Sequence, residues 1–196
     1  MAAETDISGQ VPAPEGPSSE WHPTRTTWIL WMILGLPILY VGAVVYTLAA
    51  LHGETQRSVS GTLDMGQLIV VVLLCFGLMW VHEGVHGIFM LVFGARPQFG
   101  MLRTGLLPYA FYATDPGHRF ARRQYLAVSL APLAILGLLG IPLCMLPFGG
   151  YLVVPFALHL AGCIGDIAIS RHVLQGPPTV ICEDLRDGVR FWKPVA

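Results

Sequence analysis

The chain has 196 residues, of which 54% are hydrophobic and only 12% are charged, and its mean hydropathy is +0.63. These values are too apolar for a soluble domain of this size and predict a polytopic membrane protein in contact with lipid. The net charge of −1 and the lack of a basic tract give no reason to expect nucleic acid as a partner.

The chain falls into three parts by composition. Residues 1–24 are rich in Pro, Gly, Ser and acidic residues and predict a disordered tail. Residues 25–176 hold four apolar runs, at about 28–51, 66–94, 125–147 and 151–174, each long enough to cross about 30 Å of hydrocarbon. Residues 177–196 form a polar C-terminal tail with a short strand expected at 179–182. The expected fold is an all-α integral membrane protein with four transmembrane helices.

The segment between the second and third runs differs from the rest. Residues 98–104 and 109–114 are short, with aromatic and β-branched residues, and Gly and Pro lie between them at 105–108. This pattern predicts a β-hairpin-like segment at the cytoplasmic surface of the membrane.

The basic residues predict the orientation of the four spans. With four spans both termini lie on one side, and that side holds every Lys and Arg of the 11 except Arg57. The excess of basic residues marks the cytoplasmic side, so both termini are expected in the cytoplasm, in what we expect to be a bacterial cytoplasmic membrane.

The second run contains His82-Glu83-Gly84-Val85-His86. On a helix, positions i and i+4 share a face, so both imidazoles can bind one Zn²⁺, and Glu83 can take a proton from water that the metal acidifies. The alternative is a chance match with two histidines that hydrogen-bond in the core. Three ionisable groups within five residues of an apolar span are costly in lipid, which favours a functional site.

Asp166 is the candidate third ligand. It lies about 22 Å into the fourth span and His82 about 24 Å into the second, both counted from the outer surface at 1.5 Å per residue. Two imidazoles leave a catalytic tetrahedral site one protein ligand short, and a carboxylate from another helix would supply it. The alternative is an aspartate paired with Arg171 or with a hydroxyl group.

Three further residues are weaker candidates. Ser129 could hydrogen-bond a substrate carbonyl, and Pro132 would free a helix carbonyl beside the site, so both are candidates for positioning substrate. His159 is expected to be a hydrogen-bonded packing residue rather than a ligand. The four cysteines show no Cys-x-x-Cys spacing and are expected to act as small hydrophobic residues.

Several motifs together resemble a known family. They are His82–Gly87, Phe99-Gly100 with Tyr109-Ala110, Arg122–Tyr125 before Ser129–Pro132, Gly165-Asp166 and Glu183–Gly188. Over roughly residues 66–194 the chain resembles the putative zincin peptidases, small bacterial membrane proteins long classed as a domain of unknown function.

That family is similar in layout to the site-2 intramembrane zinc metalloproteases. The resemblance implies His82, His86 and Asp166 as zinc ligands and Glu83 as the general base. One motif departs from the layout, because site-2 proteases usually carry a Leu-Asp-Gly type sequence where this chain has Ile164-Gly165-Asp166-Ile167.

The leading hypothesis is a membrane-embedded zinc metalloendopeptidase that acts on membrane or membrane-proximal peptide substrates. One alternative is a non-catalytic zinc-binding membrane protein, which would not need Glu83 and would favour a closed fourth ligand. Another is a small transporter subunit, which predicts further polar residues along the spans. The sequence predicts no oligomeric state.

Overall fold

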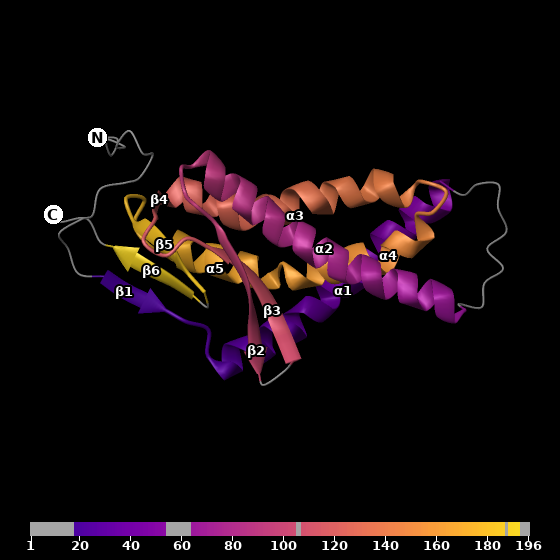
Figure 1. Ribbon diagram of the computed structural model, residues 1–196, viewed down its shortest axis with the longest axis horizontal. Coiled ribbons are helices and arrows are strands. Elements are labelled where there is room, and N and C mark those ends of the chain that lie inside the picture. Colours follow the sequence, from indigo (N-terminus) through magenta and orange to yellow (C-terminus); the bar gives the residue numbers. More distant parts are fainter. Residues whose placement is uncertain (1–17, 54–63, 105–106, 187, 193–196) are drawn as a thin grey trace. The chain divides into compact units, whose positions relative to one another are not determined.

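The computed structural model describes residues 18–53, 64–104, 107–186 and 188–192 (Figure 1). The described chain is mostly helical and also contains two small antiparallel sheets. The expectation of an all-α protein with one hairpin is therefore corrected by a second, four-stranded sheet.

The helices follow the four apolar runs closely. They are α1 (Arg25–Gly53), α2 (Met65–Val92), α3 (Arg122–Cys144), α4 (Gly150–Gly162) and α5 (Ile164–Gln175). With α4 and α5 taken together, four helices are long and apolar enough to cross a membrane. The fourth run is interrupted at Cys163, where Gly162 and Gly165 lower the helix propensity.

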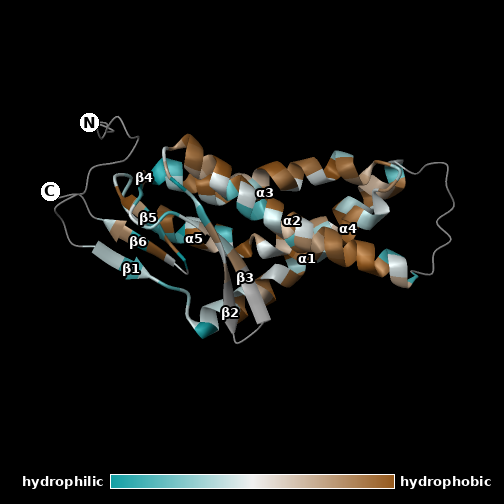
Figure 2. Cartoon of the chain, in the orientation of Figure 1, coloured by the Kyte–Doolittle hydropathy of each residue, from teal (hydrophilic) through white to brown (hydrophobic). Residues whose placement is uncertain are grey.

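Much of the helical surface is apolar and exposed. Hydrophobic residues predominate along α2 and α3 in Figure 2, and the side chains of Met32, Leu73 and Leu138 are among those that are exposed. Large apolar side chains on the outside of a helix are stable against hydrocarbon and unfavourable in water. This surface is consistent with a location in a membrane.

The chain divides into two compact units. One comprises Ile29–His82 and Pro132–Ile164, and we call it the helical unit. In it the buried Tyr46 of α1 donates a hydrogen bond from its hydroxyl to the Gly137 carbonyl (2.9 Å), and its ring lies 5.5 Å from that of Phe156. Both rings pack directly over Gly140, where a side chain would meet them at less than 3 Å. Small residues thus allow the helices of this unit to pack closely.

The other unit comprises residues 1–28, 83–131 and 165–196, and we call it the sheet unit. Its larger sheet has the order β1-β6-β5-β4, from β1 (Ser18–Trp21), β6 (Gly188–Trp192), β5 (Ile181–Leu185) and β4 (Arg119–Ala121). Apolar residues of the sheet and of the adjoining helix ends form one core, which includes Met90, Phe120, Tyr125, Val173 and Phe191.

The smaller sheet is a hairpin of β2 (Gln98–Thr104) and β3 (Leu107–Thr114), which pair in antiparallel register with Phe99 opposite Ala113. The hairpin is therefore where the sequence predicts it, although residues 105–106 lie outside the described part.

The terminal segments depart from the expectations. Residues 18–21 form β1 within the segment expected to be disordered, while residues 1–17 lie outside the described part. The C-terminal segment forms β5 and β6 rather than one strand at 179–182. Both segments gain order because β1 and β5 pair with opposite edges of β6.

Candidate metal centre

The motif His82–His86 lies on α2, as the spacing predicts, with its two histidines one turn apart. His86 is buried, and His82 and Glu83 are half-buried. The helix continues through the motif because the residues around it are apolar and no proline occurs in α2.

His86 is oriented by a carbonyl that a proline leaves available. Its Nδ1 donates a hydrogen bond to the Val128 carbonyl of α3 (2.8 Å). In a regular helix this carbonyl would accept from the residue four positions later, but that residue is Pro132, which has no N–H. A proton on Nδ1 places the lone pair of a neutral ring on Nε2, the atom that faces Asp166.

Asp166 lies in the first turn of α5, and its Oδ1 is 3.5 Å from His86 Nε2. The backbone of this turn is held from α3, because the Ser129 hydroxyl donates to the Asp166 carbonyl (3.2 Å). Ser170 in turn donates to the Ser129 hydroxyl (3.1 Å). The Ser129 hydroxyl thus contacts the Asp166 turn, and Pro132 lies four residues after the carbonyl that binds His86. A substrate-positioning role for either residue stays a prediction.

Glu83 faces the hairpin. Its carboxylate lies within hydrogen-bonding reach of the backbone of Ala113 on β3. One turn further along α2, Gly87 lies under the ring of Phe99 on β2, so close that a Cβ at Gly87 would lie 2.5 Å from the ring. Since Ala113 and Phe99 are opposite each other in the hairpin, the hairpin runs alongside the motif.

The donor atoms of His86 and Asp166 fit a zinc ion. Two ligands of a tetrahedral zinc site with bonds of about 2.0–2.2 Å lie roughly 3.4 Å apart. The separation of 3.5 Å between His86 Nε2 and Asp166 Oδ1 matches this value. The Nδ1 hydrogen bond to Val128 is also the outer interaction that metal-binding histidines ordinarily make.

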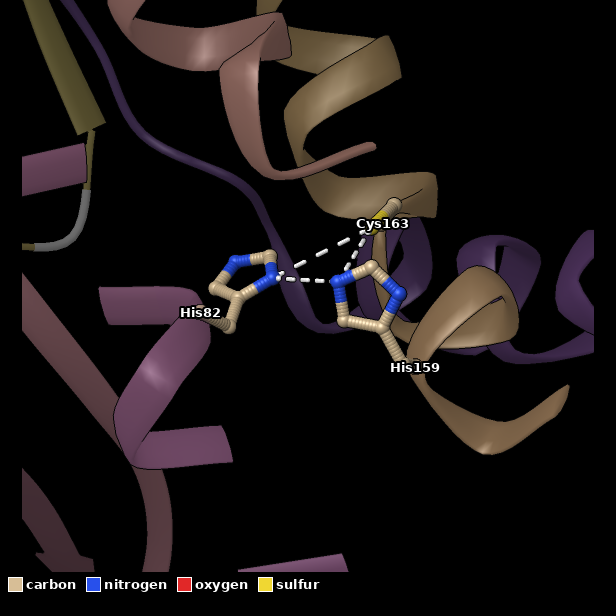
Figure 3. A group of neighbouring side chains, drawn as sticks. All are labelled: His82, His159 and Cys163. Carbon is tan, nitrogen blue, oxygen red and sulfur yellow. Dashed lines mark hydrogen bonds between the residues drawn. The ribbon is translucent and has the colours of Figure 1, made fainter. Parts of the chain in front are cut away.

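A second group of donor atoms lies in the helical unit (Figure 3). His82 Nδ1 is 3.1 Å from His159 Nε2, and the Cys163 sulfur is 3.7 Å from His159 Nε2 and 4.0 Å from His82 Nδ1. The expectation that His159 makes a hydrogen bond is confirmed, and its partner is the motif itself. Cys163, expected like the other cysteines to act as a small hydrophobic residue, lies beside both histidines. The spacing of four residues between His159 and Cys163 is the signal that could have identified the pair.

The sheet unit holds a further, half-buried carboxyl group near α3, that of Asp184. The Tyr125 hydroxyl donates to Asp184 Oδ1 (2.9 Å), and the Thr114 hydroxyl at the end of β3 donates to the Asp184 carbonyl (3.1 Å). Burial raises the pKa of Asp184 to about 6, although the hydrogen bond from Tyr125 opposes this shift. These bonds tie the hairpin and α3 to β5.

Comparison with known proteins identifies one related family. A family profile described as putative zincin peptidase matches residues 75–181, more than half of the chain. The matched segment contains the α2 motif, the hairpin, Ser129 and Asp166. No curated protein and no solved structure gives a significant match.

Proposed function

The chain belongs to the putative zincin peptidase family, and on that premise we propose that it is a membrane-embedded zinc metalloendopeptidase. Membership indicates a zinc metallopeptidase in general terms. The intramembrane location and the roles of individual residues are our proposal, supported by the four apolar helices and by the geometry around His86.

We assign the zinc ligands to His82, His86 and Asp166. The observation that carries the assignment is the approach of His86 Nε2 to Asp166 Oδ1 at 3.5 Å, with His86 Nδ1 held by Val128. His82 precedes His86 by one helical turn, so helix geometry supports it as the second imidazole ligand. Zn²⁺ in such a site supplies Lewis acidity, which polarises a scissile carbonyl and acidifies water.

Glu83 is the general base in this proposal. It takes a proton from the attacking water and returns it to the amine that leaves when the peptide bond breaks. Its position one residue after His82 places it beside the metal ligands without making it one. The Ala113 backbone near its carboxylate would orient the group relative to the hairpin.

The hairpin is a candidate binding edge for substrate. An extended peptide can add a strand to an exposed sheet edge, where main-chain hydrogen bonds hold it in register. Since β2 and β3 lie alongside the motif at Phe99 and Ala113, a peptide paired with the hairpin would pass close to Glu83. A transmembrane substrate would have to unwind to bind in this way, so we propose membrane or membrane-proximal segments as the substrate class.

We place both termini and the hairpin in the cytoplasm of a bacterium, on the strength of the basic residues. A fluorescent cysteine reagent that cannot cross membranes should label a cysteine introduced by Arg57→Cys in intact cells. It should label one introduced by Arg186→Cys only after lysis. The reverse pattern would refute the orientation.

The decisive experiment separates zinc binding from catalysis. The purified protein in detergent is incubated with a library of fluorescence-quenched peptides that each contain an apolar stretch of about 20 residues. Glu83→Gln should keep about one zinc per chain and lose cleavage by a factor of at least about 100, the lower end of the range for general acid–base catalysis. Cleavage at the wild-type rate by zinc-loaded Glu83→Gln protein would refute the mechanism.

Zinc content tests the ligand set. Asp166→Ala should lose zinc under conditions in which the wild type retains it, whereas Arg171→Ala should keep it. Zinc retained in Asp166→Ala would remove Asp166 from the site. Zinc bound without cleavage of any peptide by the wild type would favour a non-catalytic zinc-binding protein.

A further inference from the structure

His82, His159 and Cys163 form a compact set of donor atoms within the helical unit. Figure 3 shows the three side chains directed toward one another, and their donor atoms are 3.1, 3.7 and 4.0 Å apart. His159 and Cys163 are buried, and they are one helical turn apart at the end of α4. The set offers two imidazoles and one thiol.

The spacing suits a single metal ion. Bonds of about 2.0–2.3 Å to nitrogen and sulfur place the donor atoms of one ion roughly 3.3–3.9 Å apart, and the observed separations of 3.1, 3.7 and 4.0 Å lie within or about 0.2 Å outside this range. We propose that His82, His159 and Cys163 form a second metal site, which binds copper in its monovalent state. The site goes beyond the proposed peptidase, and of the zinc ligands assigned above it shares only His82.

The choice of copper(I) follows from ligand type and charge. Soft thiolate ligands favour Cu(I), and three donors are enough for it, whereas structural zinc sites usually have four. Asp64 is the only Asp, Glu, Lys or Arg among the described residues of the helical unit, and it precedes His82 by 18 positions on α2, or about 27 Å. Cu⁺ with one thiolate is electrically neutral, whereas Zn²⁺ with one thiolate would need a second anion, and Asp166, three residues after Cys163, is already assigned to the proposed zinc site. Binding of Cu⁺ releases the thiol proton to solvent, so charge and atoms balance.

The shared histidine makes the two sites mutually exclusive. A neutral imidazole has one nitrogen lone pair, and the other nitrogen carries the proton. When His82 binds zinc through Nε2, its Nδ1–H donates to His159; when Nδ1 binds copper, Nε2 is protonated and cannot bind zinc. Copper(I) would therefore displace zinc from the motif. This consequence rests on the proposed zinc site, but the copper site itself does not.

The test measures copper(I) affinity of metal-free protein in detergent, under ascorbate and without oxygen, by competition with the chelator bicinchoninate. The wild type should bind one Cu(I) per chain. Cys163→Ser and His159→Gln should weaken binding by at least about 100-fold, more than loss of an outer-sphere partner would. Cys144→Ser, a change at another buried cysteine of the same unit, and Asp166→Asn, a change at the zinc site, should bind Cu(I) like the wild type.

Two measurements on the wild type keep the proposal testable if a variant fails to fold. X-ray absorption of the copper-loaded protein should show one sulfur and two nitrogen neighbours; a shell without sulfur would overturn the site. Wild-type affinity in folded Cys163→Ser protein, or loss of binding in Asp166→Asn, would overturn it as well. Cu(I) added to zinc-loaded wild type should release one zinc per copper bound, and zinc retained beside copper would refute the exclusion. Peptide cleavage by Glu83→Gln protein tests the peptidase independently of these results.

Discussion

Replacing Pro132 with alanine should weaken zinc binding while leaving the fold as stable or more stable. Pro132 lies inside α3 and is fully buried, and its missing N–H leaves the Val128 carbonyl to the His86 ring. Alanine at this position restores the N–H that a regular helix directs at Val128. The carbonyl then accepts from its own helix, and the hydrogen bond that fixes the His86 Nδ1 proton weakens.

The substitution should raise the free energy of unfolding but lower the affinity for zinc. A proline in a helix interior costs about 3 kcal/mol, and alanine removes this cost. Loss of about two buried methylenes, at roughly 0.8 kcal/mol each, offsets about half of the gain, so unfolding should become harder by about 1 kcal/mol. Loss of an outer-sphere partner of a metal-bound histidine lowers metal affinity by about 10–100-fold. Because a carbonyl has two lone pairs and can accept both bonds, we expect the lower value, about tenfold or 1.4 kcal/mol.

Zinc affinity is measured by competition with a chelating dye, and stability by thermal unfolding of the metal-free protein in the same detergent. Pro142→Ala is the matched control, because Pro142 also lies inside α3 but is exposed and would free the Leu138 carbonyl instead. It should leave zinc affinity unchanged. Equal zinc affinity in Pro132→Ala and wild type, or equal losses in both proline variants, would refute the link from Pro132 to His86.

Three further changes test other parts of the fold by thermal unfolding in detergent. Gly140→Ala places a methyl group against two buried rings and should destabilise by about 1–3 kcal/mol, whereas Gly77→Ala meets no neighbour within 4 Å and should be neutral or stabilising. Asp184 has a folded pKa of about 6 against an ordinary 3.8, so the folded state binds more protons between these values. Stability should therefore fall by about 2 kcal/mol as the pH rises through that window, and Asp184→Asn should abolish the fall. Arg190→Gln removes the cation 2.9 Å from the buried Glu183 carboxylate and should lower the free energy of unfolding by about 2 kcal/mol. An unchanged unfolding temperature would show that Arg190 does not stabilise the Glu183 carboxylate.

The helices and the hairpin could be predicted because their signals are local. Long apolar runs require helical backbone in lipid, and the observed helices end within three residues of the predicted spans, apart from the interruption at Cys163. The hairpin has strands of alternating character around a Gly- and Pro-containing turn, and β2 has the predicted bounds of 98–104. Both features depend on residues that are neighbours in the sequence.

Most of the larger sheet could not be predicted because two of its strand pairs, β1–β6 and β4–β5, join segments that are distant in the sequence, whereas β5 and β6 form a local hairpin. Ser18–Trp21 pairs with residues 189–192, and Arg119–Ala121 pairs with residues 181–183. Each of these strands has three to five residues, too few for a hydrophobic period to identify it. Composition alone does not identify which distant segments pair.

For the site, the sequence indicated residue types better than contacts. The residue types and the number of ligands that zinc prefers pointed to the histidines on α2 and to an aspartate on a later helix. The structure brings two of these residues, His86 and Asp166, together. The expectation that Pro132 frees a carbonyl is consistent with the His86–Val128 bond. The contact of His159 with His82 could not be foreseen, because it depends on how α2 and α4 pack within the helical unit.

The Nδ1 atoms of the two motif histidines have different kinds of partner. His86 uses the Val128 carbonyl that Pro132 leaves without a helical donor, and His82 meets His159 one turn before α4 stops at Gly162. In an apolar environment a polar side chain needs a fixed partner, and a regular helix has no backbone group to spare. The proline in α3 thus gives His86 a backbone acceptor, whereas His82 obtains a side-chain partner from α4. In our two proposals, a metal that binds His82 through Nδ1 takes one imidazole from the zinc ligands and leaves His86 and Asp166 in place.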